Sequence, residues 1–584
     1  MDSPMFERNV NALAAANPHL SGRLRSAANG PRRYSFRTAR SNELVPLLTD
    51  SSGAEHPLHS TVDPCREAQK LIASLNDGSG NSSVGFLVLL GLGGGFASEA
   101  AINNGDIQRI IIIDYDISGI AELLHSRDYT KILGNSRCVL LIDPSPQEVE
   151  SIIIEQYLPS LHGAIKVLPL RPRTAQDQGL FNAATIAIES AIEKVSADYS
   201  VQAHFGMRWF CNIVRNLRSL EAANNKPGQR NILEKIFNGQ ITHAAICAAG
   251  PSLDLHIPLL AEQKRKNREL FIIAADTSLP ALLRHKLRPD AVVSIDCQHI
   301  SYYHFIGLLC RDIPLFLDIA SPPLLSRQCD TTIFCGSSHP LSRYISLNWQ
   351  PLPEIDSSGG NVAYVCLSLA QNVGAKSITV YGADFSYPRG KIYARGTYVY
   401  PFFEKKQNRL SPLESKISGF LYRSPFLAPT GNENYYETST LRFYREKFID
   451  KAESLDAHVS FEPGMGPPIL LESNKQALNA HNSRQRTGAG HMLPAHHCNS
   501  NHSAIEFLEA YKKSIEKLRF SGKVLTAKLP VPDLHSMNAN DKQILYTLLP
   551  LAAAIKHRQP SLDRGELFQA VKEYCVGVLS NSVH

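Results

Sequence analysis

Short apolar runs alternate with amphipathic stretches in the first half of the chain. After residue 80 the runs predict four strands, which are 86–90, 110–113, 138–142 and 165–168. Because strands separated by single helices lie parallel in one sheet, residues 81–180 predict a Rossmann-like α/β domain. Residues 1–80 are polar and mixed, with scattered Pro, Asn and Ser, so the pattern predicts only an irregular or helical lead-in.

A second alternating region begins at residue 241. The intervening residues 181–240 are amphipathic with no strand pattern, which predicts a helical connector. Within residues 241–473 the apolar runs predict the strands 244–248, 271–274, 291–295, 315–318, 332–335 and 377–381. The fold class that follows is α/β, with two Rossmann-like parallel-sheet domains, the central one carrying most of the polar motifs.

The composition of the chain changes at residue 474 and again at residue 504. Residues 474–503 are rich in Asn, His, Ser, Arg and Gly with few large apolar side chains, which is typical of a linker. Apolar periodicity then returns in three stretches and predicts a C-terminal helical domain over residues 504–584.

Composition and charge exclude several classes of protein. The 60 basic and 54 acidic residues are spread along the chain and leave a net charge of only +6, so we expect no nucleic-acid partner. The 11 cysteines include no C-x-x-C pair, which favours a reducing compartment, and we expect the cytoplasm. No window reaches about 18 uninterrupted apolar residues, so we expect no membrane insertion.

The first candidate site is a glycine-rich turn after the strand 86–90. Gly91 to Gly95 would open a helix whose amides can hold an anion, and Asp114 ends the next strand about where a ribose-binding acid stands. This layout resembles class I methyltransferases. Phe96 leaves the dinucleotide pattern incomplete, and glycines also serve simply to turn the chain, so both a cofactor site and a structural turn are open.

The central domain carries a denser set of polar residues at strand ends. Gly250-Pro251-Ser252 follows the strand 244–248, where Gly250 allows close approach and Ser252 can cap the next helix. Asp276 and Asp296 follow the next two strands. Since ligands of open α/β sheets bind outside the carboxyl ends of the strands, we expect these residues to face one crevice.

A second glycine-rich helix start follows in the same domain. Residues 357–361, Ser-Ser-Gly-Gly-Asn, precede an apolar helix, and Asp384 follows the strand 377–381. Two helix starts suit a substrate with a nucleotide and a phosphate, one for each part. The predicted substrate-binding residues are Gly250, Pro251, Ser252, Asp276, Ser358, Gly359, Gly360, Asn361 and Asp384.

In order and spacing these motifs resemble the motility-associated factor (Maf) family of flagellin glycosyltransferases, whose central domain is the domain of unknown function 115, also called MptE-like. The resemblance covers about residues 80–470 and is strongest over residues 244–384. It implies a sialyltransferase-like central domain that takes a CMP-activated nonulosonic acid, of the pseudaminic or legionaminic type. The implied acceptor is a Ser or Thr hydroxyl of flagellin in the cytoplasm.

The resemblance also implies catalytic roles. Similar sialyltransferases use tyrosines after the acidic strand end for the leaving phosphate, which suggests Tyr387 and Tyr393 here. Transfer also needs a base for the acceptor hydroxyl. The expected histidine has no clear counterpart, because His458 is the one histidine between Asp384 and the linker. We prefer Asp296 as the base, with Asp384, His299, His304 and His339 as alternatives.

Cofactor and function keep alternatives at this stage. No cofactor is assigned, and a divalent metal such as Mg²⁺ beside Asp296 is as consistent as a metal-independent reaction. The cluster of His491, His496, His497, Cys498 and His502 has no regular zinc spacing. The competing functions are pyrophosphoryl transfer to 6-hydroxymethylpterin, which the same domain family includes, and a non-catalytic role in flagellar assembly.

Overall fold

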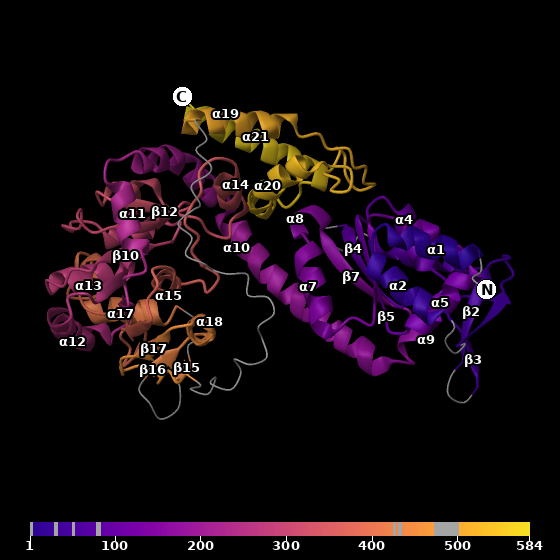
Figure 1. Ribbon diagram of the computed structural model, residues 1–584, viewed down its shortest axis with the longest axis horizontal. Coiled ribbons are helices and arrows are strands. Elements are labelled where there is room, and N and C mark those ends of the chain that lie inside the picture. Colours follow the sequence, from indigo (N-terminus) through magenta and orange to yellow (C-terminus); the bar gives the residue numbers. More distant parts are fainter. Residues whose placement is uncertain are drawn as a thin grey trace. The chain divides into compact units, whose positions relative to one another are not determined.

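The computed structural model, shown in Figure 1, describes residues 4–28, 33–49, 53–76, 83–423, 428–429, 435–471 and 502–583. The chain forms two compact units. Unit 1 comprises Met1–Met207 and Ser514–Gly577, and unit 2 comprises Arg208–Lys513 and Val578–His584. Residues 514–577 thus pack within unit 1, although they follow unit 2 in the sequence. The domain boundaries read from the sequence stay a prediction.

Unit 1 is built on a four-stranded parallel sheet in the order β6-β5-β4-β7. Its strands are β4 (Val84–Leu90), β5 (Arg109–Asp114), β6 (Cys138–Ile142) and β7 (Ala164–Pro169). All four strands predicted for this region are confirmed. Every residue of β4 is buried because helices cover both faces of the sheet. One face packs against α1 (Pro4–Ala14), α2 (Pro18–Ala27) and α5 (Ile117–Ser126), and the other against α7 (Pro146–Gln156) and α10 (Gln178–Asn224).

The lead-in is more ordered than its composition indicates. It adds a three-stranded antiparallel sheet of β1 (Tyr34–Thr38), β2 (Leu44–Thr49) and β3 (Glu55–Pro57). The central strand contains Pro46, a residue that normally argues against a strand, so sequence analysis missed it. The remaining elements before α10 are α3 (Pro64–Ala73), α4 (Phe96–Asn103), α6 (Thr130–Leu133), α8 (Pro159–His162) and α9 (Arg171–Thr174).

Unit 2 contains a seven-stranded sheet in which every neighbouring pair is parallel, in the order β12-β11-β10-β9-β8-β13-β17. The strands are β8 (His243–Cys247), β9 (Phe271–Ala275), β10 (Ala291–Ser294), β11 (Leu315–Asp318), β12 (Thr332–Cys335), β13 (Ser377–Tyr381) and β17 (His458–Phe461). The six predicted strands are confirmed, and the α/β fold class with them. Since β9 and β13 flank β8 on opposite sides, the strand order reverses between β8 and β13, where open sheets form a crevice at their carboxyl ends.

Helices of unit 2 complete its core. α15 (Val362–Asn372) is buried continuously from Ala363 to Ala370 and shares one apolar cluster with α18 (Ser439–Ser454) and α11 (Gln229–Phe237). The other helices are α12 (Leu253–Lys266), α13 (Leu279–Arg284), α14 (Pro340–Asn348), α16 (Val399–Glu404) and α17 (Leu413–Leu421). A small antiparallel sheet joins β14 (Tyr387–Pro388), β16 (Tyr435–Glu437) and β15 (Ala428–Pro429).

The second half of α10 fixes two loops of unit 2. Asn212 Nδ2 donates to the carbonyl oxygens of Cys297 (3.2 Å) and Ala320 (2.8 Å), and Asn216 Nδ2 donates to those of Ile319 and Ser321, both at 2.8 Å. These carbonyls follow β10 and β11. The helix predicted as a connector therefore also holds the loops at the carboxyl edge of the sheet.

The three predicted C-terminal helices are α19 (Ala504–Lys517), α20 (Ala539–Arg558) and α21 (Arg564–Val583). Within unit 1, α20 packs against α8, and the backbone of α20 at Pro550 lies directly against Gly206. The predicted linker falls outside the described residues except for 502 and 503. Among the described helices we find none with the length and apolarity needed to cross a membrane.

Candidate functional site

The candidate site lies at the carboxyl edge of the unit 2 sheet. Parallel strands end at one edge, so the polar residues that follow β8, β9, β10 and β13 are brought to the same side of the sheet. The predicted site residues divide there into three groups: the loop after β8 with Asp384, the loop before α15, and a group of carboxylates and tyrosines.

In the first group Asp384 binds the loop after β8. Ser252 donates to the Asp384 carboxylate twice, from its backbone N–H to Oδ2 (2.8 Å) and from its hydroxyl to Oδ1. The loop therefore differs from the sequence expectation, because the Ser252 side chain bonds Asp384 and caps no helix amide. Gly250 permits this packing, since a Cβ there would lie 2.3 Å from Asp384 Oδ2 and 2.5 Å from the Gly382 oxygen. Pro251 is buried in the same turn.

The segment after β17 closes over this group. The Met465 N–H donates to Ser252 Oγ (2.6 Å), and the Gly466 N–H donates to Asp384 Oδ1 (3.0 Å). His256 joins the same segment to β13, because its Nδ1 accepts from the Gly382 N–H while its Nε2 lies 3.0 Å from the Pro463 oxygen. A cavity of about 730 Å³ borders the group, and its lining includes Ser252, Asp384 and the exposed Arg389.

The second group is the loop before α15. Asn361 caps α15, with Oδ1 accepting from the Tyr364 N–H (3.0 Å), as the pattern of Ser and Gly before an apolar helix indicates. Both the N–H and the hydroxyl of Ser358 donate to Asp356 Oδ1, at 3.0 and 2.6 Å. Burial alone would raise the pKa of Asp356, but hydrogen bonds from Ser358, Tyr364 and Lys451 lower it to about 2.

Two glycines in this loop meet aromatic rings. A Cβ at Gly359 would lie 2.2 Å from the Tyr364 ring, and one at Gly360 would lie 3.0 Å from the Tyr444 ring. Gly360 also has a φ of +71°, which favours glycine. The loop therefore needs both glycines to bring its backbone close to the tyrosines.

The third group contains Asp276, Asp296 and several tyrosines. Asp276 is buried and accepts from the Ser294 hydroxyl (2.6 Å) and the Thr277 N–H (2.7 Å). Burial, together with the negative charge of Asp276, raises the pKa of Asp296, even though the Gln298 N–H donates to Asp296 Oδ1 (2.9 Å). Two neighbouring carboxylates in a partly buried site are a common way of producing a base.

The predicted tyrosines belong to this third group. Burial raises the pKa of Tyr387, and burial followed by the proximity of Tyr398, Tyr387 and Asp276 raises that of Tyr393. Tyrosine hydroxyls are already protonated at neutral pH, and these shifts keep them so over a wider pH range, so that they can donate hydrogen bonds. Tyr393 is the one of the two whose pKa responds to Asp276, and Tyr387 shares an apolar cluster with Tyr393 and Tyr398.

Two further tyrosines of the group were not predicted from the sequence. Burial and the charges of Asp276 and Asp296 raise the pKa of Tyr398, and burial and Asp296 raise that of Tyr444. Tyr444 joins the second and third groups, because its ring lies beside Gly360. It is on α18, and nothing in the surrounding sequence marks it. Tyr398 lies in the Tyr- and Arg-rich stretch after β13 and could have been chosen there.

The alternative bases occupy different environments. His304 is buried beside the third group, with Nε2 3.5 Å from Thr277 Oγ1 and its ring 4.7 Å from that of Tyr398. His339 caps α14 through Nδ1, which accepts from the Leu341 N–H, and burial lowers its pKa to about 4. His458 is exposed at the start of the edge strand β17, and His299 is exposed after β10.

The glycine turn of unit 1 is filled by the protein itself. The Leu92 N–H donates to Asp114 Oδ2 (2.9 Å), and the Gly94 N–H donates to His59 Nε2 (2.9 Å). Asp114 also pairs with the buried Arg173 at 2.8 Å. The amides and the carboxylate that would hold a nucleotide thus have partners within the chain, which favours the structural alternative.

No group of three or more His, Cys, Asp or Glu side chains within the described ranges is arranged to hold a metal ion. Of the histidine-rich cluster, His491, His496, His497 and Cys498 lie outside the described residues. His502 is described, and its Nδ1 lies 3.7 Å from Glu506 Oε2.

Comparisons with known proteins identify relatives of parts of the chain. Residues 212–390 match the family model described as 6-hydroxymethylpterin diphosphokinase MptE-like. An uncharacterized protein of Treponema pallidum (strain Nichols) is 30% identical over 198 residues, which are 34% of this chain and 63% of that protein. A second Treponema pallidum protein, also uncharacterized, is 34% identical over 176 residues, which are 30% of this chain and 78% of that protein. The chain thus spans less than two thirds of the first relative.

A solved structure, that of a Maf glycosyltransferase from Magnetospirillum magneticum AMB-1, has a similar fold. The TM-score is 0.52 with 12% sequence identity, and the match covers 99% of this chain and 90% of that one. This likeness extends over both units.

Proposed function

The chain belongs to one family with the second Treponema protein, contains an MptE-like domain and has a Maf-like fold, and from this premise we propose that it is a glycosyltransferase. Its proposed donor is a CMP-activated nonulosonic acid of the pseudaminic or legionaminic type. Its proposed acceptor is a Ser or Thr hydroxyl of flagellin, and the proposed role is in flagellum assembly and motility. The observation that carries the proposal is the group of two carboxylates and protonated tyrosines at the carboxyl edge of the sheet.

In the proposed reaction the bond between the anomeric carbon and the phosphate oxygen breaks, and CMP leaves with the electron pair. The acceptor oxygen forms the new bond to the anomeric carbon, and its proton passes to Asp296. Burial and Asp276 make Asp296 a stronger base than an ordinary aspartate, because they raise its pKa. Asp276 is too occupied for this role, since Ser294 and Thr277 donate to its two oxygens.

The tyrosines suit the leaving group. As CMP departs, negative charge grows on its phosphate, and donors already aimed at that position lower the barrier. Tyr387 and Tyr393 are protonated at neutral pH like any tyrosine, and burial raises their pKa values further, so they can donate without becoming negative themselves. We assign them to the phosphate.

The nucleotide is proposed to lie between the two glycine-containing loops. At the start of α15 Asn361 caps the Tyr364 amide, while the amides of Val362 and Ala363 have no partner among the described residues and can meet an anion. The loop of Gly250, Pro251 and Ser252 contributes a fixed wall and no free hydroxyl, because Ser252 is bonded to Asp384 and Met465. Asp384 thus fixes the loop in place through Ser252 and is not assigned a contact with the substrate.

The test is reconstitution with purified flagellin and CMP-activated nonulosonic acid, read by intact mass and by release of CMP. We expect added sugar mass with the wild type. Asp296→Asn should lower kcat by about 10² to 10⁴, the usual contribution of a positioned base. Asp450→Asn, which changes an exposed carboxylate on α18, should behave as the wild type. Absence of both sugar transfer and CMP release in the wild type would refute the proposal.

A second function is favoured by the description of the family model. An MptE-like domain suggests transfer of pyrophosphate from ATP to the hydroxymethyl group of a pterin, with release of AMP. Incubation with ATP and 6-hydroxymethylpterin separates the two, because AMP forms only if this second function is correct.

A further inference from the structure

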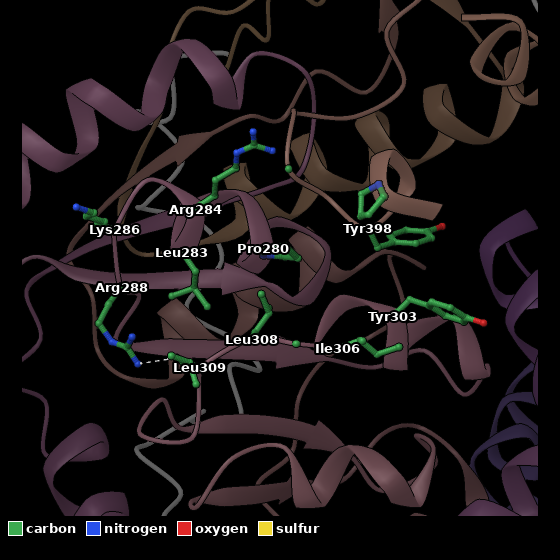
Figure 2. Close-up of a pocket in the computed structure, with 13 residues that line it drawn as sticks. Pro280, Leu283, Arg284, Lys286, Arg288, Tyr303, Ile306, Leu308, Leu309 and Tyr398 are labelled. Atoms are coloured by element: carbon green, nitrogen blue, oxygen red, sulfur yellow. Dashed lines mark hydrogen bonds between the residues drawn. The ribbon is translucent and has the colours of Figure 1, made fainter. Parts of the chain in front are cut away.

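A second cavity of about 560 Å³ opens in unit 2 beside the candidate site. Three segments line it: residues 280–288 at and after α13, residues 303–309 after β10, and residues 396–401 at the start of α16. We call it the α13 groove. Figure 2 shows Tyr303 and Tyr398 at one end of it and Lys286 and Arg288 at the other.

The tyrosine end of the α13 groove reaches the candidate site. Tyr398 lines the groove, and burial together with the charges of Asp276 and Asp296 raises the pKa of its hydroxyl. Its ring also packs against His304, with the ring centroids 4.7 Å apart. A molecule in the groove would therefore have one end at Tyr398, which packs on His304 beside the third group.

Apolar side chains are exposed along the groove. Leu309 is 86% exposed, Ile306 50% and Tyr303 45%, although large apolar side chains on a closed surface are usually covered. Gathered in one concave surface, they are typical of a site that binds another protein.

The groove also carries positive charge, from Lys286 and Arg288 at the far end and from Arg284 between the two ends. Within the part of the chain that the structure describes, no carboxylate pairs with Arg284 or Lys286, which are both exposed. Arg288 pairs with Asp312 and donates to the Leu309 oxygen at 3.2 Å. The sequence from 279 to 289 contains no acidic residue. The excess of positive charge thus belongs to Arg284 and Lys286.

We propose that the α13 groove docks an extended, acidic segment of the acceptor protein. Its carboxylates would meet Arg284 and Lys286, an apolar side chain would pack on Leu309, and its hydroxyl residue would lie at the Tyr398 end. This inference rests on the proposed function. The exposed Leu309 and Ile306 favour a peptide over the sugar donor, because aliphatic side chains of a peptide can cover them, whereas most of a sugar nucleotide's surface is phosphate and hydroxyl.

The test reverses the charge of the groove. The double variant Arg284→Glu/Lys286→Glu is compared with Arg265→Glu/Arg268→Glu, which makes the same charge change at exposed positions at the end of α12, outside the groove. The KM for acceptor, the KM for donor and kcat are measured at low and high salt. We expect the groove variant to raise the acceptor KM about tenfold at low salt, with the donor KM unchanged and no effect of the control variant.

The outcomes separate the groove from the function. If the wild type transfers sugar and the groove variant keeps its acceptor KM within twofold, or raises the donor KM instead, the groove proposal is overturned. If the wild type transfers nothing, a fluorescein-labelled peptide rich in Glu with one Leu and one Ser is titrated by anisotropy. Binding to the wild type that the groove variant loses supports docking on its own, and absence of binding overturns it. An unchanged unfolding curve in urea shows that the groove variant is folded.

Discussion

Replacement of Asp384 by Asn tests whether this residue supports the site or faces the substrate. The carboxylate is 4% exposed and accepts from the Ser252 N–H, the Ser252 hydroxyl and the Gly466 N–H. An amide keeps one acceptor oxygen and turns the other into a donor that faces these donors. At least one charge-assisted hydrogen bond is then lost, and at about 1.5 to 3 kcal/mol each the expected cost is about 2 to 5 kcal/mol.

Tryptophan fluorescence reports this loss in unit 2 alone. The chain has two tryptophans, Trp209 and Trp349, and both lie in unit 2. With a slope of about 3 kcal/mol per molar urea, the midpoint of unfolding should fall by about 1 M. Asp296→Asn is the control and should not lower the midpoint, because the backbone N–H of Gln298 can donate to an amide oxygen and the neutral side chain no longer faces the charge of Asp276. An Asp384→Asn protein with wild-type stability that no longer binds CMP would refute the supporting role.

Two other carboxylates give stability predictions. Burial raises the pKa of Asp318 to about 6, so the folded state favours its neutral form. The contribution of Asp318 to the free energy of unfolding is complete below about pH 4 and is lost as the pH rises through 6, a difference of about 3 kcal/mol. Asp318→Asn should remove this pH dependence, which is measured by comparing urea midpoints at pH 4 and pH 7 for the variant and the wild type. Asp114→Ala should destabilise unit 1 by about 3 to 5 kcal/mol because Arg173 loses its buried partner. In a urea titration, the circular dichroism signal of the helices should then begin to fall at a lower urea concentration than the tryptophan fluorescence, which reports only unit 2. An identical urea profile for either variant and the wild type would contradict the corresponding prediction.

The strands of the two parallel sheets could be predicted because they are buried on both faces, and such strands consist of continuous apolar runs. Val84–Leu90 and Leu315–Asp318 are examples. The strands β1 and β2 could not, because most of β1 is partly exposed and the buried run of β2 contains Pro46, which argues against a strand.

Some residues of the candidate site could likewise be predicted from the sequence, and others could not. Asp276 and Asp296 are predictable as neighbours, because each follows a strand and the two strands pair. The partner of Ser252 was not predictable, since Asp384 lies 132 residues away and no local pattern distinguishes a capping serine from one that binds a distant carboxylate. Tyr444 was missed for a related reason, because a helix brings it to Gly360 from beyond the motif-rich region.

Three backbone segments meet at Ser252: the loop after β8, the residues after β13 that include Asp384, and residues 465–466. A shortened protein has to include all three segments to keep this junction. A fragment trimmed to residues 212–390 would keep Asp384 but lose Met465 and Gly466, along with the edge strand β17 that pairs with β13. During synthesis the same junction has to wait until more than 200 residues beyond Ser252 have left the ribosome, since Met465 is 213 positions further on. The pocket edge is therefore one of the last parts of unit 2 to be completed, and shortened proteins should extend beyond Gly466.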